Sequence, residues 1–503
     1  MASPVTPDRT VTASAELVVP GWPYDRPGYE SLAAAAQGEG SRWNVPGVAV
    51  GIMHRGKIQT TSAGLANLVT RQPMTDDTIS QIGSISKVFT ATLAMILIEE
   101  GLLDLDRPVV TWVPDLPLAD ESARTTITLR HLLSHTAGFE GDRFIDYGRG
   151  DDSLANAVAA FGTLRQWTAP GELWSYSNAG YYLTSRIIEI AAGRPFETIF
   201  RERLVEPLGL RTAFFFAEDV ITWPHAVGHY LMRREEGHLP AHGYSFPRHV
   251  NGTGGVVTST RELLRFAQLH LNDGELDGTR LLPATATQAM REPITEAGNF
   301  HRHYGLGWCV HEYPEVRTIS HGGATRGFRA NLTVIPDRDF AIAILTNGEA
   351  GSRAIQEIEA WALDHFLDFA RPVSAPVKHS GKKLAAVAGP YRRHDGIFTV
   401  RVVGDRLDLE VVHLDEVTGE VQAEQTYPLV AVGEGRYQVP DGPDKHAIVD
   451  FIDFRGHGEP QDFLRMGGRL AERTDANGDK SAKATKAPAS KGKKLKKPSN
   501  AKK

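Results

Sequence analysis

Apolar residues gather in two widely separated parts of the chain in the way that β-hairpins require. Residues 48–64 and residues 328–347 each hold two β-prone runs joined by a short turn. Between them the apolar spacing is mainly helical, as over residues 260–274, and another helical run follows at residues 354–369. The pattern predicts an α+β fold: one antiparallel sheet, flanked by helices, that the chain leaves for an inserted helical region and later rejoins.

The pattern changes near residue 371 and predicts a second domain. We assign residues 29–370 to the first domain and the polar stretch 371–383 to a linker. Short β-prone runs over residues 384–472 predict a small all-β domain, either a barrel or a sandwich. Residues 1–28 are expected to form a loose leader, and residues 473–503, dominated by Lys, Ala, Ser and Pro, a disordered tail.

The composition is typical of a soluble globular protein, but its charge is unevenly distributed. Of 503 residues, 41% are hydrophobic and 23% are charged. Residues 480–503 contain ten lysines and no acidic residue, so the rest of the chain carries 45 of the 55 basic residues and all 61 acidic ones. An acidic body argues against specific nucleic-acid binding. The basic tail leaves a weak tether to RNA, DNA or a membrane as an alternative.

Membrane and disulfide signals are missing from the sequence. No apolar run is long enough to span a bilayer, and the N-terminus lacks the pattern of a secretory signal, so we expect a cytoplasmic protein. The alternative is a periplasmic or secreted protein from which a signal has been removed. The single cysteine, Cys309, excludes an internal disulfide framework and a cysteine-based metal cluster.

Ser84 and Lys87 are the first candidates for catalysis. The Ser-x-x-Lys spacing recurs in the linker and the tail, but only this copy opens an apolar helix. One helical turn places both side chains on the same face, so the amine can reach the hydroxyl. A serine is a weak nucleophile until a neighbour takes its proton, and Lys87 can do so only when neutral, which burial and nearby positive charge favour. The alternative is a helix-capping Ser84 with a Lys87 that reaches solvent.

Two further short motifs could complete a site. Tyr176 can shuttle a proton, and Asn178 can hold a substrate carbonyl or the lysine, although loop packing is the alternative. His321 precedes Gly322 and Gly323 at the entry to the closing hairpin. Glycines there let a substrate approach the backbone, and a following N–H can form half of an oxyanion hole.

In this order, Ser-x-x-Lys, Tyr-x-Asn and His-x-Gly resemble the motifs of the serine β-lactamase and penicillin-binding protein clan, above all its class C β-lactamase branch. The phrases HLLSHTAGF (131–139), NGTGGVVTSTREL (251–263) and YGLGW (304–308) agree, and the resemblance covers roughly residues 30–368. It implies a serine hydrolase that works through an acyl-enzyme, with no metal and no cofactor.

The resemblance also implies roles for the candidate residues. Ser84 would be the nucleophile, and Lys87 and Tyr176 would form the catalytic proton-transfer network. The N–H groups of Ser84 and Ala324 would make the oxyanion hole. The substrate-binding residues would be Asn178, His321, Gly323 and Ala324.

One departure from the class C pattern bears on the substrate. Those enzymes normally carry Lys where His321 stands. A histidine at this position is a similarity to D-aminopeptidases, S12-type peptidases and some family VIII esterases. An added C-terminal β-domain is similar to S12 peptidases with lipocalin-like domains. The expected function is a peptidase or amidase with esterase side activity on a small-molecule or peptide substrate, in a chain that could form a homo-oligomer. The alternatives are a β-lactamase or promiscuous carboxylesterase, and a non-catalytic penicillin-binding or sensor protein.

The remaining polar candidates have structural interpretations. His131 and His135 are expected to cap or bond a turn. Five histidines between His225 and His249 lie among prolines and glycines, which favours a solvated loop over a zinc site. Arg326 could bind a substrate carboxylate or lie on the surface.

Overall fold

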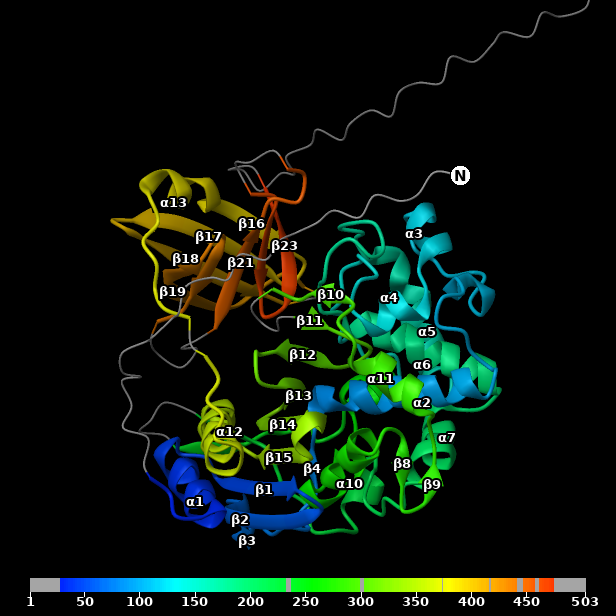
Figure 1. The fold of residues 1–503 in the computed structure, drawn as a ribbon. Helices are drawn as coiled ribbons and strands as arrows, with labels where there is room; N and C mark the ends of the chain where they lie inside the picture. The colour runs from blue at the N-terminus through cyan, green and yellow to red at the C-terminus, as the bar shows by residue number, and fades with distance from the viewer. Residues whose placement is uncertain are drawn as a thin grey trace, which may run out of the picture.

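The computed structural model shows a larger unit of sheet and helices with a β-barrel beside it (Figure 1). It describes residues 28–231, 237–298, 303–372, 374–415, 418–440, 447–456 and 461–474. The expected leader, apart from Gly28, and the expected tail from residue 475 onward lie outside the described residues.

A nine-stranded antiparallel sheet forms the centre of the larger unit. Its order is β10-β11-β12-β13-β14-β15-β1-β2-β3. In chain order the strands are β1 (Gly47–His54), β2 (Lys57–Asn67), β3 (Gln72–Pro73), β10 (Thr295–Glu296), β11 (His303–Tyr304), β12 (Cys309–Glu312), β13 (Arg317–Thr325), β14 (Phe328–Ile335) and β15 (Phe340–Thr346). Because β1 pairs with β15, the first hairpin lies beside the last one, which confirms the predicted return of the chain to one sheet.

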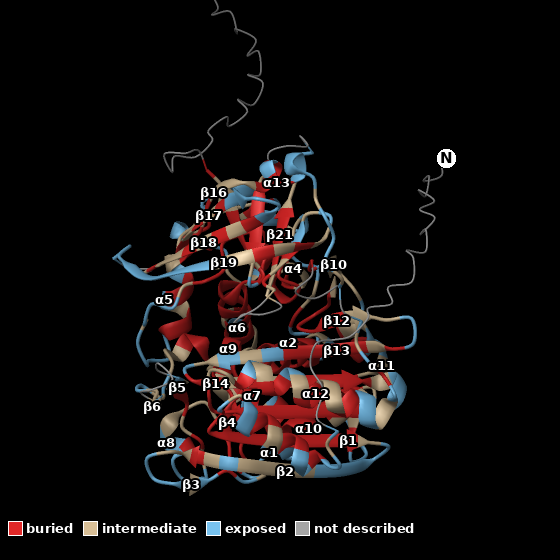
Figure 2. Ribbon diagram, turned by 90° about the vertical axis from the view of Figure 1, so that its left-hand side faces the viewer, coloured by how far each residue is buried: buried red, intermediate tan, exposed pale blue. Residues whose placement is uncertain are grey.

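Helices cover both faces of this sheet. Because its central strands are buried on both sides, they consist of continuous runs of apolar residues. α1 (Leu32–Arg42) and α12 (Gly351–Leu367) pack on one face, and α10 (Thr260–Leu271) packs on the other. Behind α10 lies α2 (Ser86–Glu99), with the rings of Phe89 and Phe266 stacked at 3.7 Å. Figure 2 shows the buried residues, in red, concentrated in the sheet and the inner helices.

The inserted region between β3 and β10 is mainly helical, as the sequence predicted. Besides α2 and α10 its helices are α3 (Glu121–Thr126), α4 (Leu129–Leu133), α5 (Ser153–Ala159), α6 (Asn178–Ala192), α7 (Phe196–Phe200), α8 (Ala217–Val220), α9 (Asn251–Gly254) and α11 (Ala284–Arg291). Short two-stranded sheets join them, formed by β4 (Ser80–Gln81) with β7 (Val257–Thr258), β5 (His229–Leu231) with β6 (His238–Pro240), and β8 (Glu275–Leu276) with β9 (Thr279–Arg280). Every residue of α2 from Ser86 to Leu97 is buried, because this helix is apolar on all sides and lies at the centre of the molecule.

The C-terminal all-β domain is a closed eight-stranded barrel, so the barrel form of the prediction is the one observed. Its strands are β16 (Gly389–Arg393), β17 (Gly396–Val403), β18 (Arg406–Leu414), β19 (Val421–Gly433), β20 (Arg436–Gln438), β21 (Ile448–Ile452), β22 (Phe463–Met466) and β23 (Arg469–Arg473). The short helix α13 (Gly381–Val387) begins inside the predicted linker and packs on the barrel core through Leu384 and Val387. The domain limits given above remain predictions.

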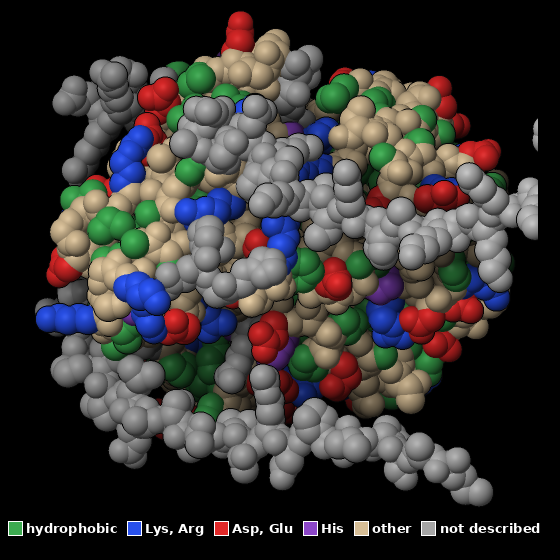
Figure 3. All heavy atoms as spheres, turned by 90° about the horizontal axis from the view of Figure 1, so that it is seen from above, with side chains coloured by type: hydrophobic (Ala, Val, Ile, Leu, Met, Phe, Trp, Pro, Cys, Tyr) green, Lys and Arg blue, Asp and Glu red, His purple; other side chains and the backbone are tan. Residues whose placement is uncertain are grey.

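The surface carries charges of both signs. On the face seen from above, the described acidic and basic side chains are interspersed (Figure 3). None of the helices in the described part of the chain has the length and apolarity needed to cross a bilayer.

Candidate active site

A cavity of about 520 Å³ lies between the central sheet, the helical region and the barrel. It brings together six of the seven residues that the sequence singled out, and the seventh, Lys87, lies buried next to Ser84. The six that line it are Ser84, Tyr176, Asn178, His321, Gly323 and Ala324.

Ser84 and Lys87 are in direct contact. Ser84 lies in the 3₁₀ turn Gly83–Ile85 that leads into α2, and it is partly exposed to the cavity. The Lys87 side chain is fully buried, and its Nζ lies 3.1 Å from Ser84 Oγ and 2.9 Å from the carbonyl oxygen of Thr253 in α9. Lys87 therefore does not reach solvent, and the alternative interpretation of this pair is wrong.

The surroundings of Lys87 favour the neutral amine. Burial lowers the pKa of Lys87 well below its usual range, and the nearby charge of Arg469 lowers it further, while Asp142 opposes the shift. A neutral amine has a free lone pair and can accept the proton of a hydroxyl 3.1 Å away.

The Tyr176 phenol lies beside this pair. Tyr176 immediately precedes Ser177, the N-cap of α6, and the centre of its ring is 4.8 Å from Lys87 Nζ. Burial raises the pKa of Tyr176, an effect that the neighbouring Ser84 hydroxyl partly opposes. The phenol is therefore protonated at neutral pH. Its buried hydroxyl faces the Ser84 hydroxyl and has no other hydrogen-bond partner among the described residues, so it can exchange a proton with the nucleophile or with a substrate.

The loop that carries Ser84 packs tightly against β13, backbone against backbone. A Cβ on Gly323 would lie 1.8 Å from the carbonyl oxygen of Ile82 and 3.3 Å from the N of Ser84. A Cβ on Gly83, whose φ is +54°, would lie 2.7 Å from the N of Ala324. Both positions therefore require glycine, and the close approach brings the N–H groups of Ser84 and Ala324 to the same end of the cavity.

His321 is buried and neutral. Its Nδ1 lies 2.7 Å from the carbonyl oxygen of Gly322, which can only accept, so Nδ1 carries the hydrogen and Nε2 accepts from the Tyr304 hydroxyl at 3.0 Å. Burial lowers the pKa of His321 to about 3, and the charge that Lys87 carries when it is protonated acts in the same direction. At neutral pH this side chain therefore brings no positive charge to the cavity.

Asp142 and Arg469 belong to the site, although the sequence analysis missed both. Asn178 Nδ2 donates to Asp142 Oδ1 at 2.5 Å, and Arg469 Nε donates to Asp142 Oδ2 at 2.6 Å. Arg469 is the first residue of β23 in the barrel, and it lines the cavity with Ser84. Neither residue belongs to a recognisable motif, so only the folded chain identifies them.

The other histidine predictions have mixed outcomes. His131 completes a capping box at the start of α4, and His135, at φ +59°, accepts the N–H of Ser177, so both are structural as predicted. The solvated loop is wrong for His229 and His249, which are fully buried.

Arg326 donates to the carbonyl oxygen of Gly243 on the exposed surface and does not line the Ser84 cavity. Of the two interpretations of this residue, the surface one fits the structure.

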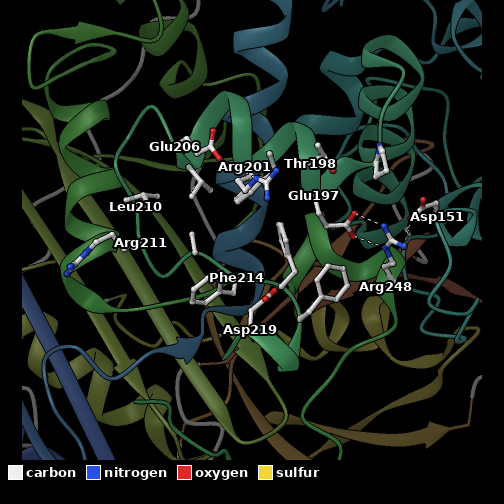
Figure 4. A pocket seen from close by; sticks show the side chains of 16 residues that line it. Asp151, Glu197, Thr198, Arg201, Glu206, Leu210, Arg211, Phe214, Asp219 and Arg248 are labelled. Atoms are coloured by element: carbon white, nitrogen blue, oxygen red, sulfur yellow. Dashed lines mark hydrogen bonds and ion pairs between the residues drawn. The ribbon is translucent and has the colours of Figure 1, made fainter. Parts of the chain in front are cut away.

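A second cavity, of about 560 Å³, shares no lining residue with the first (Figure 4). Arg248 lies at its edge and pairs with Glu197 and Asp151. None of the described residues that line it is a serine, cysteine, histidine or lysine. The side chains needed for nucleophilic catalysis thus gather in the Ser84 cavity.

Comparisons with known proteins show the family to which the chain belongs. The Beta-lactamase family profile matches residues 32–365. Penicillin-binding protein 4 of Amycolatopsis lactamdurans is 32% identical over 361 residues, which cover 70% of this chain and 94% of that protein. A β-lactamase of Pseudomonas fluorescens is 25% identical over 339 residues, 60% of this chain and 89% of that protein.

The similarity to solved structures extends over the barrel. The crystal structure of SurE with D-Leu superposes with a TM-score of 0.71 at 27% identity, and the match covers 88% of this chain and 98% of SurE. The sheet, the helical insertion and the matched profile lead to one conclusion: this chain belongs to the Beta-lactamase family of hydrolases and penicillin-binding proteins.

Proposed function

We propose that the protein is a serine hydrolase that forms an acyl-enzyme on Ser84, with peptides or amides as preferred substrates and esters as secondary ones. The observation that carries this proposal is the 3.1 Å contact between the Ser84 hydroxyl and a fully buried Lys87 amine.

The first half-reaction forms the acyl-enzyme. Neutral Lys87 takes the proton from Ser84 Oγ as that oxygen attacks the substrate carbonyl carbon. The N–H groups of Ser84 and Ala324 stabilise the negative charge that develops on the carbonyl oxygen. Tyr176 passes a proton to the leaving amine or alcohol, the bond to the leaving group breaks, and an ester on Ser84 remains.

The second half-reaction uses the same groups in reverse. A water molecule loses a proton to the Lys87–Tyr176 pair and attacks the ester carbon. The Ser84 oxygen then leaves and recovers its proton, so that the enzyme returns to its starting state with a carboxylic acid as product.

Two observations support an amide or peptide substrate over a β-lactam. Because His321 is neutral, it offers no positive charge to a β-lactam carboxylate. SurE, which matches this chain across both the sheet unit and the barrel, was crystallised with an amino acid, D-Leu. The β-lactamase alternative rests on the relative from Pseudomonas fluorescens.

A substrate panel with a Ser84→Ala control tests the proposal. We expect kcat/KM to be higher for D- or L-amino-acid amides and short peptides than for nitrocefin, with a p-nitrophenyl ester also hydrolysed. Ser84→Ala should reduce every activity to the background of the buffer. Nitrocefin turnover orders of magnitude above that of any amide would contradict the substrate preference. A long-lived adduct without turnover would instead favour a binding or sensor protein.

A further inference from the structure

The turn between β22 and β23 of the barrel lies directly on the irregular segment that carries Tyr176 and leads into α6. The N–H of Tyr176 donates to the carbonyl oxygen of Gly468 at 2.9 Å, and the N–H of Leu470 donates to Ser175 Oγ at 3.3 Å. Arg465 adds a hydrogen bond of 3.2 Å to the carbonyl oxygen of Trp174. The barrel therefore bonds three consecutive residues of the catalytic segment, ending at Tyr176.

The close approach of this turn depends on glycine. Gly467 and Gly468 have φ values of +59° and +80°. A Cβ on Gly468 would lie 2.8 Å from the Trp174 ring and 3.4 Å from Cβ of Tyr176. The turn is thus shaped to sit against these aromatic side chains, with no room for a larger residue.

Beyond the turn, an ion pair links the barrel to the substrate-binding amide. The Asp142 carboxylate is buried and has two partners, Arg469 at 2.6 Å and Asn178 at 2.5 Å. The guanidinium of Arg469 also lies over the Tyr176 ring, 4.7 Å from its centre. One barrel side chain therefore contacts Tyr176 directly and reaches Asn178 through Asp142.

We propose that Arg469 and Asp142 are positioning residues: the barrel, through this ion pair, holds Tyr176 and Asn178 in the geometry that the Ser84 reaction needs. The inference rests on the proposed function and deepens it. The Asp142 carboxylate is buried and the Arg469 side chain is half-buried, so removing either partner leaves the other charge without its counter-ion. The loss of either partner should therefore release the Asn178 amide and the Tyr176 ring together.

The same ion pair sets the charge balance around Lys87. The positive charge of Arg469 lowers the pKa of Lys87, and the negative charge of Asp142 raises it. The titratable groups that face the amine are Tyr176, Tyr181, His135, His321, Asp142 and Arg469. Activity should fall at low pH as Lys87 becomes protonated, and we call this fall in kcat/KM the acid limb of the pH profile. Removing one charge of the pair should move the acid limb in a direction set by the sign of the charge removed.

The test compares Arg469→Gln, Asp142→Asn and the double variant with wild type on the full chain. Arg401→Gln is the matched control, since Arg401 pairs with Glu410 within the barrel. The readouts are the kcat/KM for a p-nitrophenyl ester, its pH profile, and the melting temperature.

We expect each single variant to lose about 100-fold in kcat/KM, as for a catalytic group misplaced by about 1 Å. The double variant should lose no more than either single one, because all three break the same link. The acid limb should move to higher pH in Arg469→Gln and to lower pH in Asp142→Asn. Arg401→Gln should match wild type in both rate and profile.

Other results would overturn the inference. Wild-type rates in both single variants would do so. The inference would also fail if Arg469→Gln raised KM without changing kcat and Asp142→Asn had no effect, because Arg469 would then bind the substrate directly. If Arg469→Gln does not fold, Arg469→Lys keeps the charge without the guanidinium fork. Arg469→Lys should lose less kcat/KM than the neutral variants and keep the acid limb of the wild-type pH profile. A displaced acid limb would count against the inference.

The outcome is separable from that of the proposed function. If Ser84→Ala is inactive while the ion-pair variants match wild type, only the positioning role fails. If Ser84→Ala remains active, the proposed function itself fails.

Discussion

Replacing Lys87 with methionine tests whether the buried amine is neutral in the folded protein. Methionine has a similar length and no charge, so it can occupy the space between the Tyr176 and Tyr181 rings, which lie 4.8 Å and 5.6 Å from Nζ. The variant should lose about 10²- to 10⁴-fold in kcat/KM because it removes the general base. Its stability should respond to pH in a particular way.

The magnitude follows from proton linkage. In the unfolded chain Lys87 has a pKa of about 10.4, whereas in the folded protein burial lowers its pKa well below the usual range. Between those two pKa values the unfolded state holds one proton more than the native state. The free energy of unfolding of the wild type, relative to Lys87→Met, should therefore rise by about 1.4 kcal/mol for each pH unit of increase. Equivalently, the buried amine costs the wild type more stability as the pH falls through this window.

The assay is urea denaturation of both proteins at pH 7, 8 and 9, with the difference in unfolding free energy plotted against pH. Lys57→Met, at an exposed position at the start of β2, corrects for the loss of one lysine. A difference that does not change with pH would refute the reasoning, because the amine would then be protonated in both states and could not act as a base on Ser84.

Three further variants test individual parts of the account. Tyr176→Phe should lower kcat/KM by about 10²- to 10⁴-fold with an unchanged melting temperature, and wild-type rates would remove the phenol from proton transfer. His321→Gln should leave the acid limb of kcat/KM in place, because a pKa of about 3 keeps this imidazole neutral above pH 5, and a limb displaced by a pH unit or more would show that it carries a charge. Gly468→Val should destabilise the protein by about 1–3 kcal/mol more than Gly404→Val. Both glycines have positive φ, but only Gly468 faces Trp174. Equal urea midpoints for the two variants would contradict this packing.

The parts of the fold that local pattern decides could be predicted from the sequence. The hairpins at residues 48–64 and 328–347 and the buried helix after Ser84 each follow from the spacing of apolar residues over a few turns or strand lengths. Whether the C-terminal strands close into a barrel depends on how the first strand pairs with the last, here Tyr391 and Arg392 with Arg473 and Glu472. Apolar spacing along one strand carries no information about that pairing.

The part of the site that comes from long-range contacts could not be predicted. Asp142 and Arg469 meet across 327 residues of sequence, and each alone reads as an ordinary charged residue. The prolines and glycines around His229 predict a solvated loop. In the folded chain its ring accepts the N–H of Leu68 and contacts the carbonyl oxygen of Asn347, so tertiary contacts bury a segment whose composition favours a loop.

The central claim is that the hydroxyl of Ser84, activated by a buried amine, becomes covalently acylated. Mass spectrometry of the intact protein after incubation with a fluorophosphonate measures this most directly, with Ser84→Ala treated in parallel. The account predicts a single adduct on the wild type, mapped to the peptide that contains Ser84, and none on the variant. An adduct of equal yield on Ser84→Ala would contradict it.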